Sequence, residues 1–538
     1  TIKAASLAID KNNNLLDGDT TLDITNAATL RSTGNLSFGV STLGGAINVN
    51  VGGAISQTGA IAAAGTVSLT AGKDKAITLD NAANTFADTV TVNGKTDVTL
   101  SAASGIMLQG LVTNALSVNA AGVVDLGALS VGGTLNLTAA GLTDSGAVNV
   151  AGVMTLATAG GDITLDNAAT FGNVLSVSDV RNLSVGSTGA LTLGNITTTG
   201  TANFVVAGAV TQQAGSNLTF GGASSVSVGI DYQITLTQEN NSFGGNLALD
   251  AKGADVRATG ALSLSGTLRT NGLNVTGDDA ITLGVLSTGA DLAITTTGTI
   301  SQTGAINVAG MTTLATGLSN DIVLLNAGNE LGDLVTFSDV NNVTLRDMTG
   351  LTLYGSTAND LTVTAGGAIV LGSITTGGAL RLSADGTISQ ESTTDALNVG
   401  SITELTAAGA GTTYDITLAN ETDAQVPLNE FIGVVSIVNA ADVVLSSLGN
   451  LTIGVTAAGD ADIYAQTLLS LAKTTVLGDL RAQGNFTLAG DISAKTLDLI
   501  SENTYHMGGY SITAETGDIV IEAIGDIILG QIVAENGN

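Results

Sequence analysis

The chain of 538 residues carries 46 acidic and 15 basic side chains, 71 glycines and no cysteine. Its net charge of −31 at pH 7 opposes binding to nucleic acid or anionic membranes, and the lack of cysteine excludes a disulfide scaffold and thiolate metal sites. Polar residues interrupt every apolar run well before it reaches the length of a membrane-spanning helix, so we expect no membrane insertion.

Residues 1–53 are expected to form the leading turns of a β structure. Segments such as Leu22 to Ile24 and Leu36 to Phe38 alternate apolar and polar residues. Because successive side chains of a strand point to opposite faces, each segment has one apolar face. The chain begins at Thr1, as a processed product or an internal fragment would.

A repeated phrase divides the middle of the chain into five modules. Ile-Ser-Gln-Thr-Gly-Ala-Ile occurs at Ile55 and Ile300, is altered at Ile388, and is degraded at Leu142 and Val210. The steps between these positions are 87, 68, 90 and 88 residues. Self-similarity of this kind is the signature of a solenoid. The predicted modules are 54–141, 142–209, 210–299, 300–387 and 388–475, and 476–538 form atypical trailing turns.

The second module is about 20 residues shorter than the others, and the missing block corresponds to residues 354–373 of the fourth module. A coil can lose one whole turn and keep every other side chain on its face, whereas a partial loss would turn core residues toward solvent. The deletion therefore predicts turns of roughly 20–22 residues, usually four to a module and about 25 in all. At a strand spacing of ~4.8 Å, this predicts a rod roughly 120 Å long.

Periodicity within a turn predicts an all-β fold. In the segment Ala379 to Ala384, Leu380 and Leu382 would face the core while Arg381 and Ser383 face solvent. The short glycine-containing connections cannot hold crossover helices, which excludes a doubly wound α/β sheet. A phase-preserving deletion favours parallel coiling over hairpins. We therefore predict a single right-handed parallel β-helix (β-solenoid) over residues 1–538, without a capping domain.

Each module also contains an Ile-x-Leu strand, an Asn-rich turn, and then an aromatic residue or leucine. These residues are Phe86, Phe171, Phe243, Leu331 and Phe431. Their phenylalanines could be a row that stacks sugars, but their wide spacing and constant place in the module favour core positions. Three of the Ile-x-Leu strands are preceded by aspartate, at Asp162, Asp321 and Asp415.

These three aspartates lie about four predicted turns apart, which is too far for two carboxylates to act on one substrate. We expect them to cap their own turns through the backbone. His506 is the one histidine, so a two-histidine metal site is excluded, and we expect a turn or surface residue there. We predict no catalytic, cofactor-binding or metal-binding residues, no cofactor, and no enzyme activity.

The fifth module departs from the others between Ile416 and Phe431, where it has six extra residues within the stretch 420–430. Insertions in repeats form loops on one face, often the binding face, although a neutral surface loop is the alternative. The candidate contact residues of this loop are Glu421, Asp423, Pro427 and Glu430. Asn-x-Ser/Thr patterns, for example at Asn182 and Asn342, match glycosylation acceptors, but a chain rich in Asn and Thr produces many by chance.

The segment Asp526 to Ile532 matches Ala368 to Ile374, and the sequence stops in mid-turn at Asn538. Open strand edges pair with further strands. Two expectations follow: either more protein continues the solenoid, or identical chains associate end to end.

The repeated phrase, the run from Asp162 to Phe171 and the strand from Asp97 to Leu100 resemble the repeat shafts of bacterial large exoproteins, the filamentous-haemagglutinin-like group of secreted adhesins. The resemblance covers about residues 40–460 clearly. It implies a right-handed parallel β-helix that is exported and displayed on, or shed from, the cell surface of a Gram-negative-type bacterium. Glycans of a cell surface or matrix are the partners it suggests.

Together these features predict a non-enzymatic extracellular structural protein, either the shaft of a filamentous adhesin or the protomer of a fibre assembled end to end. The alternative is a β-helical polysaccharide-processing enzyme or carbohydrate-binding protein. Two carboxylates on adjacent turns inside a groove would favour the enzyme, and the sequence offers no evident pair.

Overall fold

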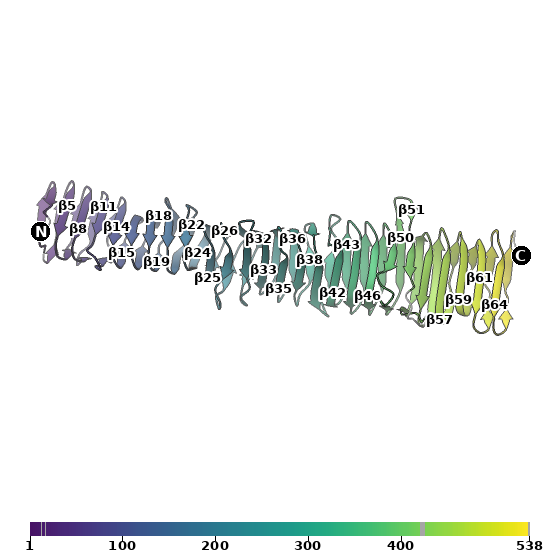
Figure 1. Cartoon of the computed structure of the whole chain (residues 1–538). Helices are drawn as coiled ribbons and strands as arrows, with labels where there is room; N and C mark the ends of the chain where they lie inside the picture. The colour runs from purple at the N-terminus through teal and green to yellow at the C-terminus, as the bar shows by residue number, and fades with distance from the viewer. Residues whose placement is uncertain (12, 17, 420–425, 536–538) are drawn as a thin grey trace. The chain divides into compact units, whose positions relative to one another are not determined.

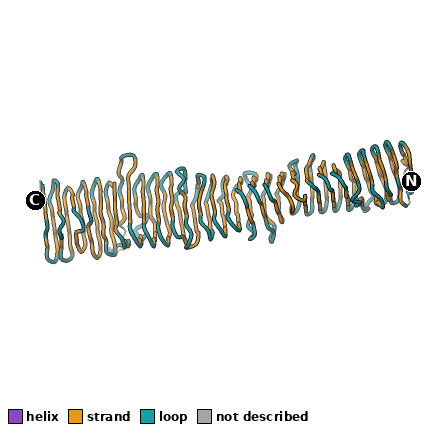
Figure 2. Tube along the Cα trace, turned by 180° about the vertical axis from the view of Figure 1, so that it is seen from behind, coloured by secondary structure: helices purple, strands orange, loops and turns teal. Residues whose placement is uncertain are grey.

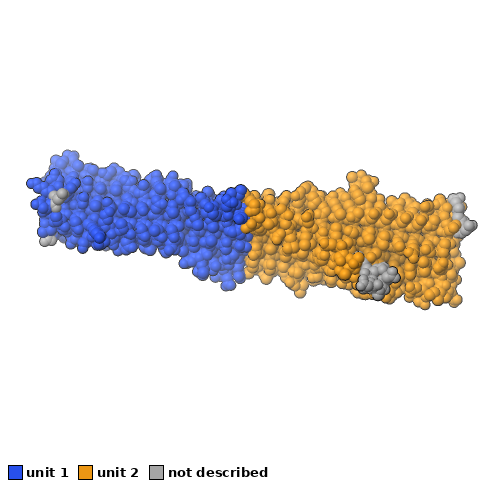
Figure 3. Space-filling view, viewed as in Figure 1, with its two compact units in different colours: residues 1–265 blue, residues 266–538 orange. Residues whose placement is uncertain are grey.

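The computed structural model describes residues 1–11, 13–16, 18–419 and 426–535. These residues form 66 strands and no helix, from β1 (Ile2–Ala4) to β66 (Gln531–Ala534). They divide into two compact units, residues 1–265 and 266–538, which Figure 3 colours blue and orange. Each unit is a stack of turns in which strands alternate with short loops (Figure 2). The predicted continuity of one domain over residues 1–538 stays a prediction.

In unit 1, strands from successive turns lie side by side and pair in parallel (Figure 1). We call such a run of paired strands a ladder. One ladder contains β8 (Ile47–Val51), β11 (Val67–Thr70), β14 (Val90–Gly94) and β16 (Ile106–Val112). Its register pairs Ile47 with Val67, Val67 with Val90, and Val90 with Leu108, so the turns of this ladder differ in length.

Unit 2 has the same architecture. One ladder contains β41 (Ile322–Leu324), β43 (Val343–Asp347), β45 (Leu361–Ala365), β47 (Leu380–Ala384) and β50 (Thr403–Gly409). Its register pairs Ile322 with Val343, Val343 with Leu361, and Leu361 with Leu380. The prediction of a parallel β-solenoid is confirmed. The chain makes about 28 turns rather than 25, because many turns are shorter than the sequence predicts.

The modules do not coincide with whole turns. In unit 2, four register steps carry Ile300 to Leu380, and Ile388 lies eight residues further along the chain. In unit 1, four steps carry Ile55 to Leu135, and Leu142 lies seven residues further on. A full module is therefore four turns and part of a fifth. Consecutive copies of the repeated phrase consequently lie in different ladders of their unit.

The short second module has lost one whole turn, as the sequence predicts. Three register steps, instead of four, carry Leu142 to Ala202, and Val210 lies eight residues beyond Ala202. The eight residues left after the whole turns thus agree, to within one residue, with the eight and seven left in the two full modules. Because the deletion equals one turn, the alternation of buried and exposed side chains continues through it.

The core runs through each stack of turns. Leu380 and Leu382 are at most 3% exposed, whereas Arg381 between them lies on the outer face, as predicted. The module residues predicted to fill the core are all at most 7% exposed: Phe86, Phe171, Phe243, Leu331 and Phe431. Of the described glycines, 12 adopt positive φ. Many of the others lie at corners, where the close approach of the neighbouring turn leaves no room for a Cβ. A Cβ at Gly377, for example, would collide with the backbone of Ala358 in the neighbouring turn.

Two consecutive turns of unit 2 are much longer than the rest. The register pairs Ile388 with Ile416 and Ile416 with Val443, and both steps exceed those of the ladder that begins at β41. In the first of them, β50 folds back on β51 (Thr412–Thr413), the one antiparallel pair recorded among the described strands. This hairpin projects from the stack (Figure 1).

Candidate functional site

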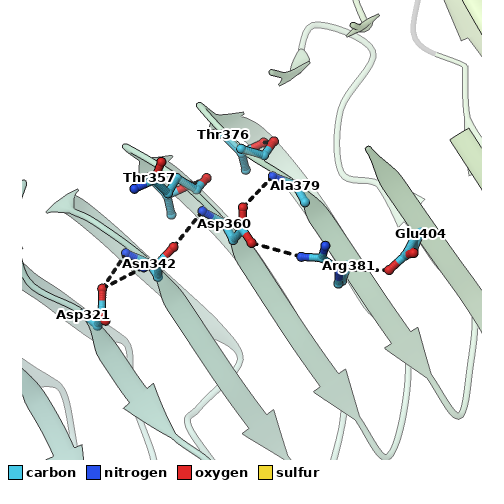
Figure 4. Close-up of polar contacts among 10 residues, drawn as sticks. Asp321, Asn342, Thr357, Asp360, Thr376, Ala379, Arg381 and Glu404 are labelled. Atoms are coloured by element: carbon cyan, nitrogen blue, oxygen red, sulfur yellow. Dashed lines mark hydrogen bonds and ion pairs between the residues drawn. The ribbon is translucent and has the colours of Figure 1, made fainter. Parts of the chain in front are cut away.

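A hydrogen bond from side chain to backbone recurs between neighbouring turns. The residue before the first buried residue of a strand is often Asp or Asn, and its side-chain oxygen accepts the backbone N–H of the corresponding residue in the next turn. In Figure 4, Asp321 accepts from Asn342 (3.1 Å), Asn342 from Asp360 (3.0 Å), and Asp360 from Ala379 (2.8 Å). We call each of these bonds an Asx rung.

Other Asx rungs occur in both units. The acceptors in unit 1 are Asn35, Asp97, Asp162, Asn182 and Asn195, and further acceptors in unit 2 are Asp291, Asp415, Asp442, Asp460 and Asp491. The prediction that Asp162, Asp321 and Asp415 cap their own turns is therefore wrong. Each instead accepts an N–H of the next turn, which parallel stacking places within hydrogen-bond distance of the carboxylate.

Arginines extend some rungs into ion pairs on the outer face. Arg381 binds Asp360 at 3.1 Å and Glu404 at 2.9 Å, and so links three successive turns (Figure 4). In unit 1, Arg181 donates two hydrogen bonds to Asp162, at 2.9 and 2.7 Å. The Arg181 guanidinium holds the pKa of Asp162 below its ordinary value, and the backbone N–H of Asn182 acts in the same direction. These carboxylates and guanidiniums are thus engaged in joining turns.

An amide pair with a fully buried asparagine occurs in four of the five modules. Its first member is the glutamine of the repeated phrase, and its second is the asparagine two residues before the module's Phe or Leu. The pairs are Gln57–Asn84, Gln212–Asn241, Gln302–Asn329 and Gln390–Asn429. In each pair both amides donate and both accept, with N···O distances of 2.7–2.9 Å.

Backbone groups complete the bonding of each pair. Asn329 is fully buried; its Oδ1 also accepts the N–H of Ile306 (3.1 Å), and its Nδ2 also donates to the carbonyl of Arg346 (3.2 Å). Gln302 Nε2 donates in addition to the carbonyl of Gly304 (2.6 Å). The pair therefore ties together three turns, with Asn329 fully buried and Gln302 half-buried. A buried polar pair that is fully satisfied specifies one register of the surrounding strands.

Sequence reasoning found both halves of this motif but not their contact. Gln302 belongs to the repeated phrase and Asn329 to the Asn-rich turn, and the two are 27 residues apart. The signal that could have joined them is their joint absence from the second module. Asp144 and Ala169 stand there instead, and Asp144 accepts the N–H groups of Asp166 (3.1 Å) and Asn167 (2.9 Å).

A cleft of about 460 Å³ in unit 2 is lined by acidic residues. Asp442, Asp460 and Asp479 precede the buried residues of three successive strands in one ladder, which places neighbouring ones about one strand spacing, ~4.8 Å, apart. The expectation that the sequence holds no carboxylates on adjacent turns is therefore wrong. The aspartates escaped notice because the steps between them are shorter than the turn length expected.

The same cleft contains one arginine. Arg481 lies between Asp462 and Asp498 on the two adjoining strands, with N···O distances of 3.8 Å to each. Asp442 and Asp460 are also Asx-rung acceptors, for the N–H groups of Asp460 (2.7 Å) and Asp479 (2.8 Å) respectively. One oxygen of each is thus engaged in joining turns.

The described residues contain no candidate metal-binding site. Over those residues, no group of three or more His, Cys, Asp or Glu side chains is arranged to hold a metal ion. His506 lies on the surface in β62 (Tyr505–His506), and its Nδ1 accepts the N–H of Gly508 at 3.1 Å, as expected for a turn residue. No helix among the described residues is long and apolar enough to cross a membrane.

The predicted contact loop is only partly described. Glu421 and Asp423 lie outside the described residues. Pro427 is buried, so its prediction as a surface contact residue is wrong. Glu430 is exposed in β53 (Glu430–Phe431) and borders a hollow of about 130 Å³ with Ile432, which is 73% exposed.

Asn182 and Asn342, two of the glycosylation patterns, use both side-chain atoms: Oδ1 accepts the N–H of an Asx rung, and Nδ2 donates to Asp162 or Asp321 respectively. A sugar on either amide nitrogen would leave it one N–H and would lie beside the aspartate of the preceding turn that this nitrogen contacts. The geometry therefore favours the chance explanation for these two patterns.

The stacked parallel ladders and the amide pair repeated with the modules define a β-solenoid repeat protein. The chain belongs to a family described as repeats of unknown function (DUF5649), whose model matches residues 25–93, 113–178, 180–250, 270–338 and 358–438, more than half of the chain. These matches start 88, 67, 90 and 88 residues apart, close to the steps of the repeated phrase. No curated protein and no solved structure matches the chain.

Proposed function

We propose that the chain is part of an extracellular structural shaft, of the kind that the resemblance to filamentous-haemagglutinin-like adhesins implies. The observation that carries the proposal is how neighbouring turns are joined. Parallel backbone ladders, Asx rungs and buried amide pairs all bind one turn to the next in both units. Such a stack resists local opening, because freeing one turn breaks bonds on both of its sides.

The rotation of the modules also supports a shaft. Consecutive copies of the repeated phrase lie in different ladders, so the modules of a unit do not present one identical surface in one direction. A repeated binding array on one side would need such alignment. A shaft needs a continuous core. A module of four turns and part of a fifth keeps the core continuous, even though it rotates the repeated phrase to another ladder.

Single-molecule stretching of the full chain tests the mechanical part of the proposal. A shaft should unravel at its ends in small steps, each releasing one turn, or roughly 60–80 Å of extended chain. Release of either whole unit in a single low-force event would refute it. Antibody labelling of the intact cells that produce the protein tests its location, and labelling that requires permeabilised cells would contradict an extracellular role.

Self-association end to end remains part of the proposal, as do glycans as partners of the assembled fibre. Electron microscopy of the purified chain should show assemblies longer than one chain if copies join. Particles of one chain at all concentrations would reject self-association and leave the shaft itself standing.

A second candidate function is supported by the cleft at Asp442, Asp460 and Asp479. Carboxylates separated by about 5 Å are used by retaining glycosidases, and those about 6.5–9.5 Å apart by inverting ones. One and two strand spacings, ~4.8 and ~9.6 Å, fall in or near these ranges. If the cleft cleaves polysaccharide, the purified chain should release reducing ends, and Asp479→Asn should abolish the release. Absence of release from neutral and acidic polysaccharides would reject this candidate.

A further inference from the structure

An aromatic ring covers a glycine of unit 2, close to the first of the two longest turns. Tyr354 belongs to β44 (Leu351–Thr357), and Gly372 to the neighbouring β46 (Ile369–Thr376). Ring atoms Cε1 and Cζ of Tyr354 occupy the space where a Cβ on residue 372 would lie. The ring thus lies against the backbone of Gly372, across the direction of the strands.

Covering a glycine is a structural role that other side chains perform in unit 1. In the same Leu-Gly-x-Leu or Leu-Gly-x-Ile context, Gln109 lies over Gly127, and Ser176 with Val174 lies over Gly194. An aromatic ring is therefore not required for covering. What distinguishes Tyr354 is the presence of carboxylates at the far end of its ring.

These carboxylates come from a loop in the first long turn. Glu391 lies next to the covered glycine, because its backbone N–H donates to the carbonyl of Leu371 at 2.8 Å, and its side chain is the hydrogen-bonding group that most raises the pKa of the Tyr354 hydroxyl. Ser373 Oγ donates to Asp395 at 2.9 Å. Gln390 and Leu397 are seven residues apart, whereas the equivalent Gln302 and Ile306 are four apart, so the loop is an insertion. The bond to Glu391, burial and the charge of Asp395 raise the pKa of Tyr354 to about 12.

The face of an aromatic ring is electrically negative, and it attracts cations most when carboxylates lie nearby. Here the ring lies beside an exposed carboxylate, Glu391, and a second that is 7% exposed, Asp395. The strand beneath the ring continues through Thr375 to the hollow bordered by Glu430 and the exposed Ile432. The surface thus combines a ring face, negative charge and an adjacent apolar position.

We propose that Tyr354 and Glu391 form a docking site for a lysine or arginine side chain of a partner protein, with the cation over the ring and against the carboxylate. Charge complementarity favours this occupant over a neutral sugar, and the chain's net charge of −31 steers basic partners toward it. The site adds a specific contact to the chain and does not rest on the proposed shaft function.

The test uses the full chain and calorimetry at moderate, near-physiological salt, with a capped Gly/Ser peptide that contains two central arginines. The same peptide with citrulline in place of arginine is the neutral control. Tyr354→Leu keeps a side chain over Gly372 but removes the ring, and should weaken binding by roughly threefold to thirtyfold. Tyr354→Phe should change affinity by less than about twofold, while Glu391→Gln should weaken it.

Glu404→Gln is the matched control, because it also removes one surface carboxylate but lies beside Arg381 rather than beside a ring. It should bind the arginine peptide nearly as the wild type does. Equal losses in Glu404→Gln and Tyr354→Leu would overturn the site, as they would show attraction to the overall charge alone. Equal binding of the citrulline peptide, or Tyr354-dependent binding of a neutral oligosaccharide instead, would also overturn it.

Discussion

Replacing Asn329 by alanine should destabilise the fourth module locally and strongly. The change removes four hydrogen bonds: two with Gln302, one with the Ile306 N–H and one with the Arg346 carbonyl. The Ile306 N–H is buried and is left without this acceptor, which costs about 1–3 kcal/mol, and the other three bonds contribute about 0.5–1.5 kcal/mol each. The expected local loss is therefore about 2.5–7.5 kcal/mol.

Amide hydrogen exchange is the appropriate measurement, because a long stack of repeats does not unfold in one two-state step. At about 1.4 kcal/mol for each factor of ten, exchange of the Ile306 amide and its neighbours in β39 (Ile306–Val308) should accelerate roughly 10²- to 10⁵-fold. Amides several turns away should change little, since each turn depends mainly on its neighbours.

Asn326→Ala is the matched control. Asn326 lies in the same turn, but its side chain accepts an N–H only within that turn, from Gly328 at 2.9 Å. A double-mutant cycle with Gln302→Ala should give a coupling energy of about 0.5–3 kcal/mol, because the pair shares two hydrogen bonds. If Asn329→Ala and Asn326→Ala accelerate exchange equally, or the cycle shows no coupling, the role assigned to the amide pair is wrong.

Three further predictions concern the deletion pattern, the cleft and pH. Removing residues 354–371 takes out one register step, that from Leu353 to Leu371, so the shortened chain should fold with native circular dichroism. Removing 354–370 should instead destabilise the fold locally, because Leu371 would follow Leu353 directly and the rest of β46 would be out of phase with its neighbouring strands. Equal behaviour of the two deletions would contradict the register argument. Asp460→Asn should leave the free energy of unfolding unchanged or slightly higher at low salt, because asparagine keeps the rung acceptor and removes repulsion from neighbouring aspartates. Asp460→Ala removes the acceptor and should cost about 1 kcal/mol. Amide hydrogen exchange in the adjoining strands distinguishes the two variants. The pKa of Asp162 is held below its ordinary value, so its pair with Arg181 contributes stability above the unfolded pKa of about 3.9, and this contribution is lost as the pH falls through the lower folded value. Asp162→Asn should therefore be slightly less stable than the wild type at pH 7, with the difference disappearing in acid; a difference that persists in acid would refute the assignment.

The class of fold was readable from the sequence because it depends on local periodicity. Alternation in segments such as Leu380 to Ala384 identifies strands, and the repeated phrase identifies a solenoid. The one-turn deletion in the second module even revealed that the strands coil in parallel, since only whole turns can be lost without reversing the faces. These features need no knowledge of which distant residues touch.

The length of a turn was harder to read, because the repeat unit of the sequence is the module and not the turn. A module is four turns and part of a fifth, so dividing its length by four overestimates the turn. The same error hid Asp442, Asp460 and Asp479, whose spacing became meaningful once the register was known.

Sequence by itself determined that this protein is a stacked β repeat, because each strand records in its own residues which face is buried. Tertiary structure alone decided the partners of the polar groups: Gln302 with Asn329, Asp321 with Asn342, and Tyr354 with Glu391. The physical reason is that hydrogen bonds and ion pairs act over about 3–4 Å. In a solenoid, polar groups that lie this close together in space are separated along the chain by one or two turns. The length of each turn depends on the geometry of its corners, which the local sequence pattern does not show.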